Sequence, residues 1–262
     1  MSKTLNLIDI LLTTGRHLVL MGRFTEALDP LTKLSRFRSL PEPVSEELQS
    51  LLADIHLQHQ KYKQARRHLT AALAIRPLNA EYHYLMGVAI HEDEEADPKR
   101  AEMYYARAVE LEPAQSAYWI DFGSYLFTMG KSEEGLKALR KAATEGSDDA
   151  DIIGEVAAIL RREGHAEEAT AMLRSALFHN HGSPPFRRIW QQHQFQMIYA
   201  EQRKKKSNAA DMRPVILPFV GRPTQGKYLE LGGKTIRIDQ AEPLSEPKEK
   251  TPAPFRRPPK KG

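Results

Sequence analysis

A single spacing of small and apolar residues recurs five times along this chain. In the clearest copy Ala101 is followed after four residues by Tyr105, after three more by Ala108 and after five more by Pro113. Copies return at intervals of 34 to 38 residues. They comprise Ala27, Leu31, Leu34 and Ser39; Ala65, Leu69, Ala72 and Pro77; Gly135, Leu139, Ala142 and Ser147; and Ala169, Leu173, Ala176 and His181. A spacing held in register this often indicates stacked repeats rather than one mixed core.

Each copy is preceded by a second amphipathic stretch that also carries one small residue. These small residues stand about twelve positions upstream, at Gly15, Ala53, Gly87, Gly123 and Ala157. Gly22, Gly130 and Gly164 fall between the two stretches, where a chain reversal needs a residue that readily takes positive φ. The pattern therefore predicts five helical hairpins.

The repeated unit resembles the tetratricopeptide repeat (TPR), a helix–turn–helix of 34 residues. The segment WIDFGSYL, with Trp119, Phe122, Gly123 and Leu126, is the best match to that pattern. The resemblance implies an all-α fold, a right-handed superhelical solenoid of stacked hairpins. The expected domain, residues 1–183, holds units at 8–41, 46–79, 80–115, 116–149 and 150–183.

Two units depart from the regular length of the repeat. HEDEEADPKR in the third unit and LPEPVS after the first are interpreted as longer loops, the acidic run being solvated.

A stack of repeats must also cover the apolar face of its last unit. Residues 184–206 are expected to form this capping helix, with a stripe of Ile189, Trp190, His193, Met197 and Ile198.

The remaining residues change character. We expect residues 207–240 to be extended and to include a β-hairpin around Gly232-Gly233, with Leu229 opposite Ile236 and with Leu231 and Ile238 on the same face. Residues 241–262 are expected to be a disordered, basic, Pro-rich tail. Residues 203–262 carry 15 Lys/Arg against 6 Asp/Glu, whereas residues 1–202 carry 23 against 28. This asymmetry indicates two segments with different roles.

The resemblance also implies a binding face, because the first helices of successive TPR units line a concave surface that holds segments of partner proteins. Acidic residues recur in that lining, so a protein or peptide segment with apolar anchors and Lys or Arg would suit it. The Lys/Asn/Arg clamp with which some members hold a carboxylate is absent at Leu12, Arg16, Ser50, Leu51 and Asp121. Carried over by repeat position, the lining comprises Leu12, Arg16, Glu47, Ser50, Asp54, Leu57, Glu81, Tyr84, Val88, His91, Ile120, Ser124, Phe127, Asp151, Ala158 and Arg161.

Nothing in the sequence favours catalysis. The chain has no cysteine, and it has no phosphate loop, nucleophile elbow or zinc-protease helix. His179 and His181 have the spacing of metal ligands but no obvious third ligand. The acidic run HEDEEAD lacks the glycine and the alternating Asp or Asn residues of a calcium-binding loop. His56 is expected to be a packed, hydrogen-bonded core residue. We expect no enzyme, cofactor or metal.

Charges interrupt the apolar N-terminal stretch LNLIDILLTTGRHLVLMG, so no membrane span is expected and a cytoplasmic location is favoured. The leading functional hypothesis is a non-catalytic adaptor or scaffold that binds a partner segment. The alternative is a nucleic-acid-associated protein that uses the basic tail. A third possibility is that several lining residues merely solvate the face. The tail could also dock on its own repeats, with RPVILPFV along the concave face.

Overall fold

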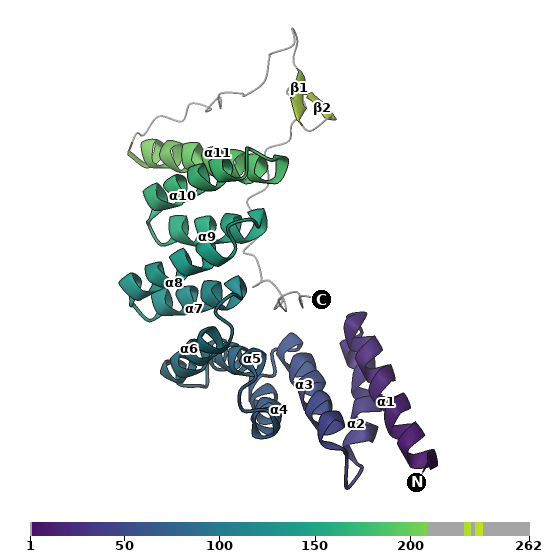
Figure 1. Ribbon diagram of the computed structural model, residues 1–262. Helices are drawn as coiled ribbons and strands as arrows, with labels where there is room; N and C mark the ends of the chain where they lie inside the picture. Colours follow the sequence, from purple (N-terminus) through teal and green to yellow (C-terminus); the bar gives the residue numbers. More distant parts are fainter. Residues whose placement is uncertain (1, 209–227, 232–233, 238–262) are drawn as a thin grey trace. The chain divides into compact units, whose positions relative to one another are not determined.

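The computed structural model describes residues 2–208, 228–231 and 234–237, with side chains described for residues 6–203. These residues form eleven α-helices, one 3-10 helix and one two-stranded sheet (Figure 1). The helices are α1 (Ser2–Leu20), α2 (Phe24–Ser35), α3 (Glu42–Gln58), α4 (Tyr62–Ile75), α5 (Ala80–His91), η1 (Pro98–Arg100), α6 (Ala101–Leu111), α7 (Ser116–Thr128), α8 (Ser132–Glu145), α9 (Ala150–Arg162), α10 (Ala166–His179) and α11 (Pro184–Asn208). The strands are β1 (Tyr228–Leu231) and β2 (Lys234–Arg237).

Consecutive helices pack as five hairpins, α1/α2, α3/α4, α5/α6, α7/α8 and α9/α10. The second helix of each hairpin also packs against the first helix of the next one, so the hairpins stack in chain order (Figure 1). These five hairpins therefore form the all-α solenoid that the spacing predicts.

The small residues of the first helices allow the second helices to pack closely. A Cβ atom placed on Gly87 would lie 3.0 Å from the ring of Tyr105, and one on Gly123 would lie 2.9 Å from Leu139. Carbon atoms in contact normally lie about 3.5–4.0 Å apart, so a larger residue would push these helices apart. The small residues thus have the role that the repeat pattern predicts.

The reversals inside the hairpins use left-handed backbone. Gly22, Gly130 and Gly164 have φ of 72°, 75° and 91°, which confirms the prediction made for them. In the second hairpin the corresponding turn residue is Gln60, which takes φ of 57° although its side chain makes that conformation costly.

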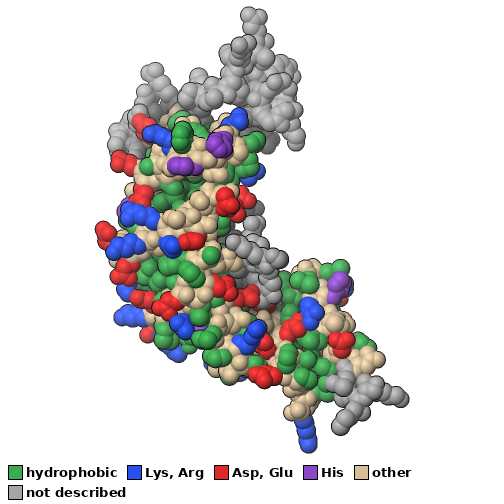
Figure 2. All heavy atoms as spheres, viewed as in Figure 1, with side chains coloured by type: hydrophobic (Ala, Val, Ile, Leu, Met, Phe, Trp, Pro, Cys, Tyr) green, Lys and Arg blue, Asp and Glu red, His purple; other side chains and the backbone are tan. Residues whose placement is uncertain are grey.

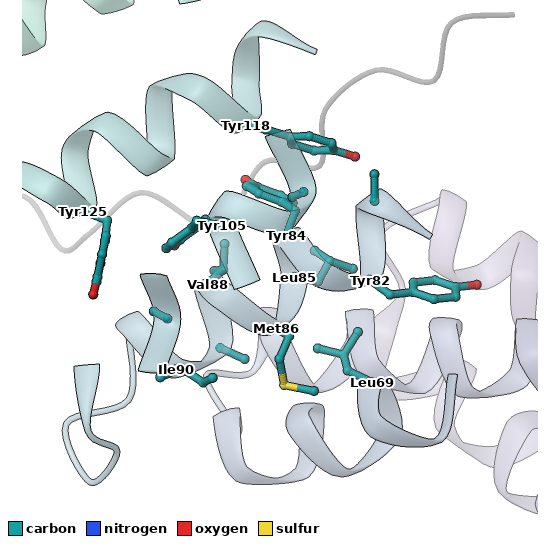
Figure 3. Packing of buried hydrophobic residues seen from close by; sticks show 14 of the residues in the cluster. Leu69, Tyr82, Tyr84, Leu85, Met86, Val88, Ile90, Tyr105, Tyr118 and Tyr125 are labelled. Carbon is teal, nitrogen blue, oxygen red and sulfur yellow. The ribbon is translucent and has the colours of Figure 1, made fainter. Parts of the chain in front are cut away.

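The apolar interior runs through the stack as three successive clusters of buried side chains rather than around one centre. The middle cluster contains Ala101, Tyr105 and Ala108 of α6, which are at most 2% exposed. Figure 3 shows Tyr105 together with side chains from α4, α5 and α7. The residues of the repeated spacing are therefore the packing residues of the second helices.

The acidic loop of the third hairpin differs from the solvated loop expected for it. Arg66 of α4 forms an ion pair with Asp93 and donates a hydrogen bond of 2.9 Å to the carbonyl of Ala89. Asp97 accepts a hydrogen bond from the N–H of Lys99 and caps η1. Part of the acidic run thus holds the enlarged loop against α4 because Arg66 lies beneath it.

His56 is packed as expected, but its hydrogen bonding is not. Its ring stacks on that of His68, with centroids 5.2 Å apart and planes 8° apart. Burial, and the nearby charge of His68, lower the pKa of His56 to about 4. Within the described part of the chain its buried Nδ1 has no hydrogen-bond partner, so the sequence prediction is corrected there.

The described residues fall into two compact units, one ending at His193 and one beginning at Gln194. In the first unit, Phe186, Ile189 and His193 of α11 are buried, and Nε2 of His193 lies 2.8 Å from Oγ1 of Thr170. Ile198 is 37% exposed, so the predicted apolar stripe does not continue through it as buried surface.

The hairpin of β1 and β2 has the predicted register. Its strands are antiparallel, Leu229 pairs with Ile236, and Leu231 pairs with Lys234. The predictions for Ile238, for the extended segment RPVILPFVGRP and for the tail at 241–262 lie outside the described residues.

Candidate partner-binding face of the first helices

The helices α3, α5, α7 and α9 are the first helices of hairpins two to five, and their side chains meet between neighbouring hairpins. We call this surface the first-helix face and define its centre by four residues, Tyr84, Tyr118, Asp121 and Glu155. They come from α5, α7 and α9, so three hairpins contribute to the centre.

A tyrosine–aspartate pair joins α5 to α7. The hydroxyl of Tyr84 donates a hydrogen bond of 2.5 Å to Oδ2 of Asp121. The ring of Tyr84 stacks on that of Tyr118, with centroids 4.6 Å apart and an interplanar angle of 25° (Figure 3). Both rings are 2% exposed, so the centre of the face consists of a packed aromatic pair that is hydrogen-bonded to a carboxylate.

Burial, and to a smaller extent nearby acidic charge, makes the ionised form of Asp121 costly. Burial raises the pKa of Asp121 to about 6; the hydrogen bond from Tyr84 opposes that rise, and repulsion from Glu155 and Glu92 adds to it. Burial, and next the charge of Asp121, raise the pKa of Tyr84 well above its ordinary value, so its hydroxyl stays protonated. A cation placed beside Asp121 would remove much of this cost.

Several predicted lining residues are buried in the structure. Leu12, Leu57, Val88 and Ile120 belong to the apolar clusters and are 3–7% exposed, and Tyr84 is 2% exposed. The polar residues Ser50 and Asp54 are also buried, at 7% and 5%. Each of these side chains lies within the packed surface.

Other predicted lining residues are engaged with charged or polar neighbours. Arg16 of α1 forms a two-pronged ion pair with Glu47 of α3, one hydrogen bond measuring 2.7 Å. Asp151 lies 3.5 Å from Arg188 of α11. The guanidinium of Arg161 lies 3.5 Å from Nδ1 of His193. These contacts tie neighbouring helices together.

Two predicted lining residues face the interior of the stack. Phe127 lies against Gly135, where a Cβ atom would be 2.9 Å from its ring, and against the ring of His165. His91 packs edge-on to Tyr125, with centroids 5.3 Å apart. Glu81, Ser124 and Ala158 are partly exposed on the first helices.

The sequence prediction missed Tyr118 and Glu155, and it considered Asp121 only as a position at which a carboxylate clamp is absent. Asp121 and Glu155 stand 34 residues apart, at equivalent positions of the fourth and fifth units. This recurrence of an acidic residue at equivalent positions of two successive units is the sequence signal that could have identified these two residues. Tyr84 and Tyr118 are also 34 residues apart, but the two extra residues of the third unit place them at different positions of their repeats, so the repeat pattern does not pair them.

Away from the first-helix face, the described surface mixes different kinds of side chain. Figure 2 shows hydrophobic side chains interspersed with acidic and basic ones along the hairpins. A depression of about 550 Å³ lies between α8 and α10 and includes Arg140, Met172 and His179 in its lining. The described residues contain no cluster of three or more His, Cys, Asp or Glu side chains that could hold a metal ion.

Comparison with known proteins identifies the fold only. The sequence matches no protein-family profile and no curated protein. Among solved structures, a MamA fragment (41-end) from Desulfovibrio magneticus RS-1 matches with a TM-score of 0.54 and 16% identity, over 68% of this chain and 97% of that one. Another MamA structure matches with a TM-score of 0.51 and 19% identity, over 65% and 90% of the two chains.

A thermophilic TPR protein in Thermus thermophilus, TTC0263, matches with a TM-score of 0.50 and 18% identity, over 72% of this chain and 99% of that one. The protein thus has the fold of a TPR solenoid, as its sequence resemblance implies. Among the described helices, none combines the length and the apolar character that crossing a membrane requires.

Proposed function

We propose that the protein is a non-catalytic scaffold whose first-helix face binds a segment of another protein carrying Lys or Arg beside apolar side chains. The observation that supports this proposal most is the placing of Asp121. Asp121 accepts a hydrogen bond from Tyr84 of the preceding hairpin, and burial raises its pKa to about 6, so a cation bound beside it would stabilise its ionised form.

The chemistry of the segment follows from the residues at the centre of the face. A guanidinium or ammonium group next to Asp121 would oppose the repulsion from Glu155 and stabilise the ionised carboxylate. The rings of Tyr84 and Tyr118 are stacked and each is 2% exposed, so they hold Asp121 in position from below. Apolar contacts would supply the affinity, and the carboxylates would set register and encounter rate.

The test is a selection of random twelve-residue peptides displayed on phage against the full-length chain, followed by titration of the selected peptides. The expected consensus carries Lys or Arg next to an apolar residue. Asp121→Asn should weaken binding about tenfold, which corresponds to about 1.4 kcal/mol. Glu133→Gln neutralises an exposed acid on a second helix and should leave binding unchanged. Peptides without basic residues, or equal binding by both variants, would reject the proposal.

Nucleic-acid binding through the basic tail is the competing outcome. A fluorescent single-stranded DNA of about 20 nucleotides would then bind with an affinity that falls steeply as salt rises. That binding would also be indifferent to Asp121→Asn, because the tail and not the face would make the contacts.

A further inference from the structure

The helix α11 covers the fifth hairpin with one side of its first turns. Phe186, Ile189 and His193 are 4%, 7% and 3% exposed and have the spacing of neighbours on one helical face. Ile189 lies against α9, where a Cβ atom on Gly154 would be 3.2 Å from its side chain. Phe186 and Ile189 are apolar, whereas the buried ring nitrogens of His193 need hydrogen-bond partners.

The ring of His193 meets both helices of the fifth hairpin. Its Nδ1 lies 3.5 Å from Nη1 of Arg161 on α9, and its Nε2 lies 2.8 Å from Oγ1 of Thr170 on α10. The hydroxyl of Thr170 in turn donates a hydrogen bond of 2.8 Å to the carbonyl oxygen of Ala166. One side chain of α11 therefore connects that helix to α9 and to α10.

These neighbours determine which ring nitrogen of His193 carries the proton. A guanidinium has donors only, so Nδ1, which faces Arg161, has to be the unprotonated acceptor. The proton of the neutral ring then lies on Nε2 and is donated to Thr170, whose own proton is already directed to Ala166. The hydrogen bonds thus run in one direction, from Arg161 through His193 and Thr170 to Ala166.

We propose that His193 is a pH-sensitive latch, which holds residues 184–193 of α11 on the fifth hairpin while its Nδ1 is unprotonated and releases them when that nitrogen takes up a proton. A proton on Nδ1 would point at the guanidinium of Arg161, where it finds no acceptor and places two positive charges side by side. Release would uncover the surface of α9 around Gly154 that Ile189 covers. The latch concerns the end of the stack rather than Asp121, so it goes beyond the proposed function and does not depend on it.

The charged groups that α9 and α10 bring to this end of the stack oppose protonation of the ring. From α9 the charged neighbour is Arg161. From α10, Arg174 lies over Trp190, with its guanidinium carbon 6.0 Å from the ring centre, and Trp190 lies against His193 with ring centroids 6.2 Å apart. Both groups are cations. Burial, and next the charge of Arg161, lower the pKa of His193.

The direction of the pH dependence follows from this lowered pKa. The unfolded or released ring takes up its proton near the ordinary pKa of about 6.5, whereas the ring in the closed latch resists it. The stabilisation by neutral His193 is therefore fully present above pH about 6.5 and is lost as pH falls through the lower pKa of the closed state. Because one proton is involved, the equilibrium constant for opening rises at most about tenfold for each pH unit.

Hydrogen–deuterium exchange of the full-length chain, followed by mass spectrometry, tests the latch at pH 6.5 and pH 5.0. After correction for the intrinsic pH dependence of exchange, opening of residues 184–193 should increase severalfold, and at most about thirtyfold, at the lower pH. Opening of α5 and α6 should increase less, because the latch is local. A nitrogen-15 NMR spectrum at pH 7.5 should show His193 with its proton on Nε2.

Two glutamine variants make the test specific. The amide of His193→Gln can accept from Arg161 and donate to Thr170 as the neutral ring does, but it takes up no proton, so the pH dependence of residues 184–193 should disappear. The matched control is His179→Gln, which changes an exposed histidine of α10 and should leave that dependence in place.

Three results would overturn the inference: a proton on Nδ1 at pH 7.5, opening of residues 184–193 that is independent of pH, or an unchanged pH dependence in His193→Gln. If His193→Gln loosens α11 already at pH 7.5, Arg161→Gln decides the matter, because it removes the facing charge and leaves the histidine. A smaller pH dependence in that variant supports the latch, and a parent-like one rejects it.

Discussion

The hydroxyl of Tyr84 on α5 donates a hydrogen bond of 2.5 Å to Oδ2 of Asp121 on α7, and this contact joins the third and fourth hairpins at the centre of the first-helix face. The same pair combines a packing role with a chemical one. Tyr84 is buried against Tyr118, whereas Asp121 carries a charge that its own surroundings disfavour.

Removing the Tyr84 hydroxyl should raise the pKa of Asp121 above about 6. The hydrogen bond from Tyr84 is what opposes the effect of burial and of Glu155, so Tyr84→Phe leaves the ionised carboxylate less stabilised. The measurement is an NMR titration of the Asp121 side-chain carboxyl carbon. The matched control is Tyr82→Phe on the same helix as Tyr84; it removes a 2.7 Å hydrogen bond to Glu46 of α3 and should leave the Asp121 titration unchanged. An unchanged pKa in Tyr84→Phe would contradict the electrostatic description of the face.

Neutralising Asp121 should stabilise the chain at neutral pH. Because the pKa of Asp121 is raised in the folded state to about 6, the folded state binds the proton more tightly than the unfolded one. Stability from this group is present below pH about 4 and is lost as pH rises to about 6. Asp121→Asn should therefore gain about 1–3 kcal/mol in free energy of unfolding at pH 7.5, and little at pH 4. Urea titrations at both values check this, and a loss of stability at pH 7.5 would refute it.

His56 should contribute the opposite pH dependence. Its pKa is lowered by burial to about 4, so the folded state disfavours the protonated ring. The stability associated with neutral His56 is present above pH about 6.5 and is lost as pH falls toward about 4. His56→Leu should show a smaller loss of stability across that interval than the parent chain, as measured by urea unfolding at several pH values. Parallel curves for the two chains would show that His56 is not the group responsible.

The turn residue Gln60 offers a route to higher stability. Its φ of 57° costs an L-amino acid about 1–2 kcal/mol, and glycine removes that cost but gains entropy in the unfolded state. Gln60→Gly should raise the free energy of unfolding by about 0.5–1 kcal/mol. The reciprocal change, Gly130→Ala at φ of 75°, should lower it by a similar amount. A thermal melt of each variant decides the matter, and destabilisation by Gln60→Gly would show that the Gln60 side chain makes a compensating contact.

The repeat was predictable from the sequence because each hairpin packs through the same small and apolar positions. Tyr105 is buried as its spacing indicates, and Gly123 lies against Leu139 as a small residue of a first helix should. The exposure of the candidate lining residues was less predictable because position in a repeat does not decide exposure. Ile120 and Leu57 occupy lining positions but are buried between hairpins, whereas Asp121, the residue beside Ile120, stands at the centre of the face. Arg66 of α4 and Asp93 of the longer third loop form an ion pair that no spacing rule anticipates.

The central claim is that Asp121 helps the first-helix face to hold a cationic segment. Isothermal titration of a phage-selected peptide that carries Lys or Arg beside an apolar residue into the full-length chain tests it most directly. The account predicts binding at one site, weakened about tenfold by adding Asp121→Asn and unchanged by adding Glu133→Gln. Equal affinity in all three chains, or no binding in any, would contradict it.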